Sequence, residues 1–239
     1  KHIRSFTLEE RIPLWVHDTY DAPNNAAIND AFIAEVDFGL DGCTKKEKKT
    51  YPDLCAPDMF LVTAAGVYLY PGRANGKFGN PIEASPQVMS YVALDDHNGD
   101  GVFDLVGLQD AVLQVFPGSP KAGGGLSFGE PLPDPQSLPV LKTGDDESLA
   151  LVGVRMVLAD FNHDDINDAL ISTPVGIGSI LLLIGLEDGG FAAPEIFGGV
   201  TDARDCRVAD INSDGFLDVV IIRTGSNLIS VYPGDGTGK

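Results

Sequence analysis

Short apolar runs alternate with polar or glycine-rich turns along this chain, and no long stretch carries apolar residues at helical spacing. Three segments share one pattern: LDDHNGDGVFDLVGL from Leu94, LADFNHDDINDALIS from Leu158 and VADINSDGFLDVVII from Val208. Each has an apolar entry, the motif D-x-N-x-D-[GD]-x-x-D and a second apolar run. Short runs bounded by turn residues are typical of strands, so the pattern predicts an all-β chain with the motif in a loop between two strands.

The motif recurs at the spacing of a structural repeat. Its first aspartates, Asp96, Asp160 and Asp210, are 64 and 50 residues apart, and a weaker copy, VDFGLDG, occupies residues 36–42. Two strands are predicted after each loop; the second ends in glycine, and F-x-x-P follows in three of the four units. These residues are Gly72, Phe78 and Pro81; Gly118, Phe128 and Pro131; Gly185, Phe191 and Pro194; and Gly234 alone. A unit of about 60 residues with three to four antiparallel strands has the size of a β-propeller blade.

The charge balance excludes one class of partner. The 239 residues include 35 acidic and 16 basic side chains, a formal net charge of −19, whereas nucleic-acid binding needs a basic face. Hydrophobic residues make up 44 %, enough to form a packed core. An uncharged stretch at residues 169–186 contains proline and glycine in its middle. It therefore predicts two buried strands joined by a turn, not a membrane span.

The placement of the aspartates indicates cation sites. Calcium takes about six to eight oxygen ligands, which loop positions 1, 3, 5 and 9 can supply from side chains and position 7 from its backbone carbonyl. Position 6 must turn sharply, which favours glycine. The predicted ligands are Asp96, Asn98, Asp100, Val102 and Asp104; Asp160, Asn162, Asp164, Ile166 and Asp168; and Asp210, Asn212, Asp214, Phe216 and Asp218.

These loops have two interpretations. Aspartate and asparagine are common in plain turns that hold no ion. Three copies in the same strand context favour calcium, since the three carboxylates of one loop repel each other unless a cation lies between them. The sequence therefore predicts about three bound Ca²⁺ ions.

The loops, the strands after them and the PG…F-x-x-P endings resemble FG-GAP or VCBS-type repeats, the calcium-loop blades of integrin α-subunit-like β-propellers. The resemblance covers about Ile33 to Lys239. It implies four-stranded antiparallel blades in which the loop joins the two inner strands and the ion braces it. The blades would span approximately 33–90, 91–153, 154–204 and 205–239, after a lead-in segment at 1–32. Asp165 replaces the turn glycine of the family, a position that aspartate tolerates better than most residues.

The repeat pattern also predicts an incomplete array. Phe78 and Phe191 each follow the strand-ending glycine by six residues, and the same count from Gly234 reaches position 240. The resembling family usually has about seven blades, within the range known for propellers. We therefore expect about four repeats here to be part of a larger propeller, with further blades beyond Lys239 or from a partner.

The upstream copy departs from the pattern. Asp37 and Asp41 match loop positions 1 and 5, and Asp58 takes the final place after an insertion that holds Cys43 and Cys55. We interpret this segment as a blade with a weaker calcium site, whose loop carries an insertion closed by a Cys43–Cys55 disulfide. The lysines of the insertion form either a solvated surface or a loop that docks a partner. The third cysteine, Cys206, is predicted to be a buried apolar thiol.

Enzyme signatures are missing from the sequence: HExxH, G-x-S-x-G and phosphate-binding glycine loops are all absent. We therefore expect a non-catalytic, calcium-binding propeller that recognises, adheres to or assembles with a protein partner. A disulfide implies an oxidising compartment, so the expected location is extracellular, at the cell surface or periplasmic. The alternative is a carbohydrate-binding propeller, or a non-catalytic propeller attached to a secreted enzyme.

Overall fold

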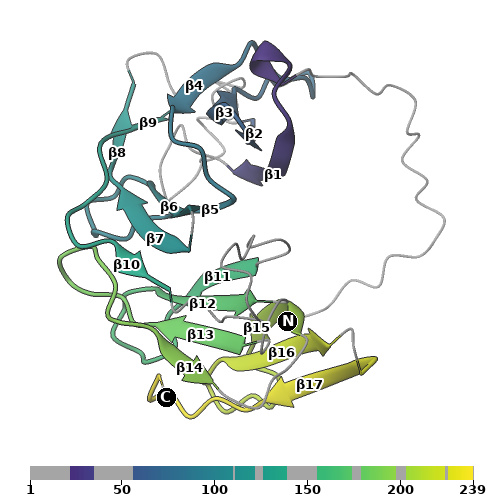
Figure 1. The fold of residues 1–239 in the computed structure, drawn as a ribbon, viewed down its shortest axis with the longest axis vertical. Coiled ribbons are helices and arrows are strands. Elements are labelled where there is room, and N and C mark those ends of the chain that lie inside the picture. Colours follow the sequence, from purple (N-terminus) through teal and green to yellow (C-terminus); the bar gives the residue numbers. More distant parts are fainter. Residues whose placement is uncertain are drawn as a thin grey trace, which may run out of the picture.

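The computed structural model describes residues 22–34, 56–109, 111–121, 126–138, 155–173, 179–197, 203–223 and 226–238. They form strands β1 to β17 and one short 3-10 helix, η1 (Pro23–Asn25). Three four-stranded sheets and one three-stranded sheet, all antiparallel, follow one another along an arc (Figure 1). We call these sheets blades 1 to 4. The predicted all-β class and four-stranded blades are confirmed.

Blades 1 and 3 share the simplest topology, in which the strands pair in sequence order. Blade 1 consists of β1 (Ile28–Ala34), β2 (Asp58–Thr63), β3 (Gly66–Tyr70) and β4 (Ile82–Ser85). Blade 3 consists of β11 (Arg155–Ala159), β12 (Asp168–Thr173), β13 (Ser179–Leu183) and β14 (Glu195–Phe197). Each fourth strand begins one residue after a proline, Pro81 or Pro194. Proline has no N–H to donate, and at the start of an edge strand this breaks no hydrogen bond of the sheet.

Blade 2 contains an additional hairpin. Its sheet is formed by β5 (Tyr91–Asp95), β6 (Asp104–Gln109), β7 (Val112–Phe116) and the short β10 (Gln136–Ser137). Between β7 and β10, strands β8 (Gly118–Pro120) and β9 (Leu126–Phe128) form a separate pair in which Gly118 lies opposite Phe128. The same glycine–phenylalanine bridge joins Gly72 to Phe78 and Gly185 to Phe191. The longer spacing between the glycine and the phenylalanine in blade 2 therefore comes from an additional hairpin, and the contact between the two residues is the same as in blades 1 and 3.

Blade 4 has three described strands, β15 (Ala203–Ala209), β16 (Asp218–Arg223) and β17 (Leu228–Tyr232). The first strands of two blades begin before the blade boundaries that the repeat spacing predicted. β1 begins at Ile28, before the expected boundary at 33, and β15 begins at Ala203, before 205. The loop motif marks the end of each first strand, and it carries no information about where that strand starts.

Apolar clusters join successive blades face to face. Strands β2, β6 and β12 are buried on both faces, which explains why they read as nearly continuous apolar runs. The clusters include Phe60 and Leu105 between blades 1 and 2, Val106 and Leu181 between blades 2 and 3, and Leu170 and Ile221 between blades 3 and 4.

The uncharged stretch at residues 169–186 lies mainly on β12 and β13, which pair antiparallel. Leu170, Ile171 and Leu181 from these strands are buried. No helix within the described ranges is long and apolar enough to cross a membrane. The expectation of two buried strands is confirmed.

Candidate metal-binding loops

The three acidic motifs form loops at the same place in successive blades. Residues 96–103 join β5 to β6, residues 160–167 join β11 to β12, and residues 210–217 join β15 to β16. In each blade these are the first and second strands of the sheet. The loops therefore lie between the two inner strands, as the family resemblance implied.

Two positions in every loop adopt the left-handed backbone conformation. At position 6 the φ values are 85° for Gly101, 68° for Asp165 and 93° for Gly215. At position 4 they are 72° for Gly99, 63° for His163 and 63° for Ser213. Side-chain-bearing residues are strained in this region. The three loops therefore share one backbone path that does not depend on glycine at either position.

The aspartate at position 1 folds over the turn and accepts hydrogen bonds from it. Asp160 Oδ1 accepts from the N–H of His163 at 2.6 Å, and Asp160 Oδ2 accepts from the N–H of Asp165 at 3.0 Å. Asp210 Oδ2 accepts from the N–H of Gly215 at 3.0 Å in the same way. These bonds hold the strained turn in place, because each satisfies an N–H that the turn leaves without a β-sheet partner.

In the first loop, one carboxylate oxygen of the aspartate at position 1 accepts no hydrogen bond from a described residue. Asp96 Oδ2 accepts from the N–H of Gly101 at 2.9 Å. Asp96 Oδ1 is buried and has no hydrogen-bond partner among the described residues. A buried carboxylate oxygen without a partner is costly, and a bound cation is one way to satisfy it.

Positions 3 and 5 are coupled through the asparagine amide. Asn162 Nδ2 donates to Asp164 Oδ2 at 2.8 Å, and Asn212 Nδ2 donates to Asp214 Oδ2 at 2.8 Å. The other oxygen of Asp164 accepts from the N–H of Ile166 at 2.9 Å. Asp164, Asn212 and Asp214 are exposed and Asn162 is half-buried, so their oxygens are accessible to an ion from solvent.

The aspartate at position 9 differs from the others because it is buried and connects two strands. Asp168 Oδ2 accepts from the N–H of Phe161 at 2.9 Å, at the start of the loop. Asp168 Oδ1 accepts from the N–H of Gly185 at 2.8 Å, just after β13. We call this pair of bonds the aspartate clip. It closes the loop onto the second strand and fixes the point where the chain leaves the third strand.

The aspartate clip recurs around the array. Asp104 and Asp218 make the equivalent bonds to His97 and Gly118 and to Ile211 and Gly234, at 2.9 to 3.1 Å. In blade 1, Asp58 accepts from the N–H of Gly72 at 2.7 Å. All four aspartates are at most 1 % exposed. A Cβ on any of the four glycines would clash with a backbone oxygen, which accounts for the glycine that ends every third strand.

The clip aspartates have shifted pKa values. Burial raises the pKa of the Asp104 and Asp168 carboxyls, and the N–H groups of Gly118 and Gly185 oppose this shift. The pKa of Asp218 is lowered instead, by the N–H groups of Gly234 and Ile211. Described blades flank Asp104 and Asp168 on both sides but Asp218 on one side only. A divalent cation in the loop would lower the raised values, because an opposite charge favours the ionised form.

The donor set of the loops fits calcium. The predicted ligands of each loop are carboxylate, amide and carbonyl oxygens, which this hard cation prefers. The uncovered Asp96 Oδ1 adds an acceptor that the protein alone does not satisfy. Among the described residues, no three His, Cys, Asp or Glu side chains already converge as a metal cluster. The carboxylates instead hold N–H groups of their own loop.

Several predicted residues lie outside the described ranges. These are Asp37 and Asp41 of the weaker loop and the proposed disulfide partners Cys43 and Cys55. Cys206 is buried and unbonded, and burial raises the pKa of its thiol, which makes it a poor nucleophile. The interpretation of Cys206 as a buried thiol is confirmed.

Residues 160–221 match the family model of the FG-GAP-like repeat. The chain contains an FG-GAP-like repeat. The match runs from the first aspartate of the second loop, through the third loop, into β16. A comparison with curated proteins gives no match.

Solved structures with a similar fold include a lectin from Agrocybe aegerita described as recognising non-reducing terminal N-acetylglucosamine. The TM-score is 0.53 at 19 % identity, and the alignment covers 89 % of this chain and 51 % of the lectin chain. The chain thus spans about half the length of that protein. A Photorhabdus luminescens Tc holotoxin pore also aligns, with a TM-score of 0.46, 15 % identity, and coverage of 94 % of this chain and 9 % of the toxin chain.

Residues in and next to the acidic loop of blade 2 contact blade 3. The His97 ring is buried and stacks on Phe191 with 4.2 Å between centroids. Its Nε2 lies 3.1 Å from the carbonyl oxygen of Gly190, and its Nδ1 lies 3.2 Å from Asp95 Oδ2. Asn167 Nδ2 donates to Asp95 Oδ1 at 2.8 Å. The sequence carries no signal for this connection, because it joins residues far apart along the chain.

The strain at position 6 gives a matched pair of substitutions. Gly215→Ala should lower the free energy of unfolding by about 1–2 kcal/mol, because φ is 93° and an added Cβ meets nothing within 4 Å, so the effect is in the backbone alone. Asp165→Gly should not destabilise the protein, because it removes strain at the equivalent position. Denaturant unfolding of both variants measures this. A stable Gly215→Ala variant would contradict the backbone path described for the loop.

Proposed function

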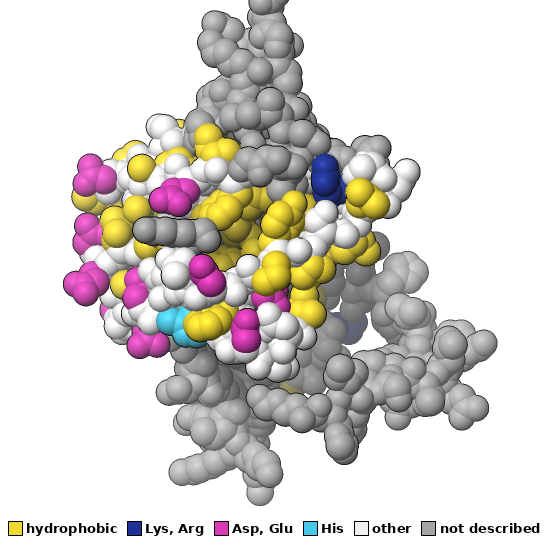
Figure 2. All heavy atoms as spheres, turned by 90° about the horizontal axis from the view of Figure 1, so that it is seen from below, with side chains coloured by type: hydrophobic (Ala, Val, Ile, Leu, Met, Phe, Trp, Pro, Cys, Tyr) yellow, Lys and Arg dark blue, Asp and Glu magenta, His cyan; other side chains and the backbone are white. Residues whose placement is uncertain are grey.

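We propose that this chain is a non-catalytic, calcium-braced propeller-type module that recognises a protein partner outside the cytoplasm. The observation that carries the recognition role lies on blade 4. Ile222, Ile229 and Val231 lie on the face that points away from blade 3, and they are 44 %, 71 % and 51 % exposed. Figure 2 views the molecule from the end that holds blades 3 and 4, and hydrophobic side chains gather there with acidic side chains around them.

The register of the strands supports the interpretation of this face as a surface that another β-sheet covers. In blade 4, Val231 and Ile229 of β17 pair with the second and fourth residues after the clip aspartate. In blade 2, Val115 and Leu113 of β7 pair with the second and fourth residues after its clip aspartate, so the two pairs occupy equivalent positions. Leu113 and Val115 are 1 % and 3 % exposed, and they belong to the cluster between blades 2 and 3. Exposed apolar patches of this kind mark interaction sites. An aliphatic β-sheet face fits this surface, because such faces cover the equivalent positions within the array. A further blade of the larger propeller or a protein partner would present such a face.

Calcium would act as a brace for the module. In the second loop Asp160, Asn162, Asp164 and Asp168 with the carbonyl of Ile166 would hold the ion, and the matching residues of the other loops would hold theirs. The ion supplies positive charge that offsets repulsion among the loop carboxylates. The loop residues themselves hold the first and second strands together through the aspartate clip, so ion binding and blade geometry are coupled.

A location outside the cytoplasm rests on the predicted Cys43–Cys55 disulfide, since such bonds persist in oxidising compartments. Peptide mapping of the native protein without reduction should recover Cys43 linked to Cys55 and Cys206 as a free thiol. A bond that includes Cys206 would contradict both the pairing and the burial of that side chain.

The calcium role predicts about three ions per chain with dissociation constants of roughly 10⁻⁴–10⁻³ M or tighter. An ion that binds only the folded state stabilises it by about 2.7 kcal/mol when present at a hundredfold excess over Kd. Chelation should therefore lower the melting temperature, and Asp214→Ala should remove one ion. The measurements are calorimetric titration of the chelated protein and metal analysis after dialysis.

A substitution in the same loop serves as the control for calcium binding. Ser213→Ala changes an exposed residue at position 4, which is not a predicted ligand, so the ion count should stay unchanged. If chelation alters neither the melting temperature nor the bound-metal content, calcium has no structural role here and the acidic loops are plain turns.

The recognition role can be tested with paired variants. Ile229→Asp should abolish capture of a specific partner from the native source, whereas Val88→Asp, at a 43 % exposed position elsewhere, should leave it intact. Both should melt close to the wild type, since substitutions at exposed positions usually change stability by less than about 0.5 kcal/mol. Quantitative crosslinking with the three baits in parallel gives the comparison. Equal capture by all three would argue against the blade 4 face.

The carbohydrate-binding alternative is supported only by the fold likeness to the lectin, which at 19 % identity does not extend to the ligand. Calcium-dependent binding on a glycan array that survives Ile229→Asp would favour this alternative over protein recognition.

A further inference from the structure

A side-chain hydrogen bond joins the first acidic loop to the second. Asp95 lies immediately before Asp96, the residue at position 1 of the first loop. Asn167 occupies position 8 of the second loop, between Ile166 and the clip residue Asp168. Asn167 Nδ2 donates to Asp95 Oδ1 at 2.8 Å, although 72 residues separate the two along the chain. The bond therefore connects the immediate neighbours of predicted calcium ligands in two different loops.

The ring of His97, at position 2 of the first loop, contacts the same carboxylate. Its Nδ1 lies 3.2 Å from Asp95 Oδ2, and the side chains of His97 and Asp95 are 0 % and 13 % exposed. The ring also reaches the second loop, since a Cβ on Gly185 would meet His97 Cε1 at 3.2 Å and Ile166 Cγ2 at 2.6 Å. Gly185 is the glycine that the second aspartate clip holds. We call Asp95, His97 and Asn167 the polar bridge.

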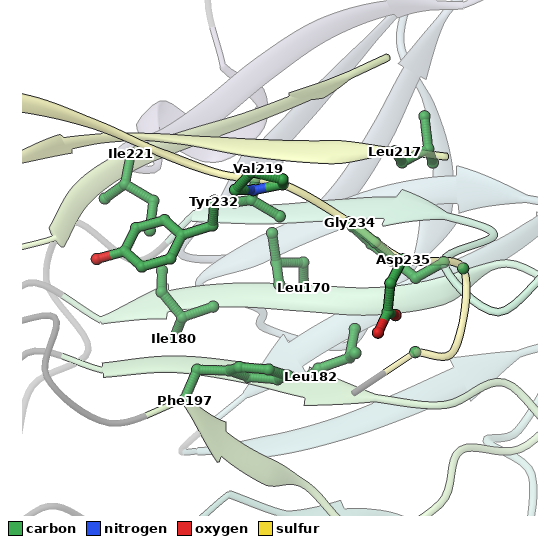
Figure 3. Close-up of a pocket in the computed structure, with 14 residues that line it drawn as sticks. Leu170, Ile180, Leu182, Phe197, Leu217, Val219, Ile221, Tyr232, Gly234 and Asp235 are labelled. Carbon is green, nitrogen blue, oxygen red and sulfur yellow. The ribbon is translucent and has the colours of Figure 1, made fainter. Parts of the chain in front are cut away.

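The same three positions are apolar at the next junction, between blades 3 and 4. The residues that correspond to Asp95, His97 and Asn167 are Ala159, Phe161 and Leu217. They belong to the apolar cluster of that junction or pack against it. Figure 3 shows this junction, where Leu217 and Leu170 line the same apolar cavity. The three positions thus change together from polar to apolar, which indicates that they act as one set.

The second and third loops meet through a ring contact instead. His163 is exposed, and its ring lies edge-on to Phe216 with 5.2 Å between the centroids. A hydrogen bond at a buried junction restrains its partners more than this contact does, because it is directional and solvent competes for it less. We therefore expect weaker coupling between the second and third loops than between the first and second.

Calcium binding requires each loop to hold its ligands in fixed positions, and this ordering costs conformational entropy. In the first loop, an ion would give the buried Asp96 Oδ1 the partner that no described residue supplies. It would also fix the backbone from Asp95 to His97, and with it the bond to Asn167. Because Asn167 lies between two predicted ligands, the second loop would then need less further ordering. A first ligand that orders a shared contact favours the second ligand in this way.

We propose that calcium ions bind cooperatively to the first and second loops, because the polar bridge couples the two sites. The third loop lacks such a bridge to the second loop, so its ion binds nearly independently. The coupling is reciprocal, so each of the two ions raises the affinity of the other site by the same factor. This inference rests on the proposed calcium role and describes how two of those sites regulate each other.

Calcium titration of the whole 239-residue chain, followed by amide NMR, tests the coupling. The position 6 amides of Gly101, Asp165 and Gly215 each donate to the aspartate at position 1, so each reports on one loop. Asp100→Ala removes a predicted ligand of the first loop. It should weaken calcium binding at the second loop about fivefold, as read at the Asp165 amide, which is the lower end of common coupling factors.

Asp214→Ala is the matched control, because it removes the same ligand position from the third loop. It should change the affinity of the second loop less than about twofold, below the usual range of coupling factors. Both substitutions remove one negative charge from a neighbouring loop. An effect of lost charge alone would therefore appear in both variants.

Asn167→Leu tests the polar bridge itself, since leucine occupies the same position of the third loop. In this background, Asp100→Ala should no longer alter the affinity of the second loop. If Asn167→Leu does not fold because Asp95 has lost its partner, Asp95→Ala is added to it. The double variant recreates the pair Ala159 and Leu217 of the next junction.

Two outcomes would overturn the coupling alone. An unchanged affinity of the second loop in Asp100→Ala would show that the two sites are independent. A weakening that persists in the Asn167→Leu background would show that it does not pass through the polar bridge. If none of the three reporter amides shifts with calcium, the proposed calcium role fails and the coupling fails with it. Three separate titrations without coupling would leave the calcium role intact.

Discussion

The structure depends most on the aspartate clip, the buried carboxylate that ends each acidic loop and accepts N–H groups from two different segments. Asp104, Asp168 and Asp218 each hold the start of the loop with one oxygen and the glycine after the third strand with the other. A buried carboxylate is tolerated only when its acceptors are satisfied, and two backbone donors satisfy this one. The clip therefore determines both the loop geometry and the direction in which the chain leaves the blade.

The glycine at the other end of the clip links the blade to its neighbour. It approaches a backbone oxygen too closely for any Cβ, and it begins the turn that leads to the buried phenylalanine of the repeat. In blade 3 that phenylalanine is Phe191, which stacks on His97 at position 2 of the preceding loop. The clip thus links the acidic loop to the end of the third strand, and the turn that follows leads to the contact with the neighbouring blade.

The molecule has two kinds of exposed surface, which differ in polarity. The acidic loops are exposed because polar side chains gain little from burial, and their oxygens remain available to a cation. The aliphatic face of blade 4 is exposed although its side chains match positions that are buried elsewhere. Burial of a comparable aliphatic side chain contributes about 1.5–3 kcal/mol, so a protein that covers this face would gain substantial binding energy. The first surface suits an ion and the second suits a protein.

The sequence by itself determined the strands, the repeat and the place of the loops, because all three follow from local spacing. Alternation of apolar runs with D-x-N-x-D motifs specifies a strand–loop–strand unit, and F-x-x-P marks the outer strand. The sequence placed Asp58 and its counterparts at the end of each loop, but it did not reveal the aspartate clip, the hairpin formed by β8 and β9, or the contacts of His97. The bond from His97 to Gly190 spans 93 residues, and that from Asn167 to Asp95 spans 72. Such contacts were decided only by the tertiary structure, because they depend on how one blade stacks on the next.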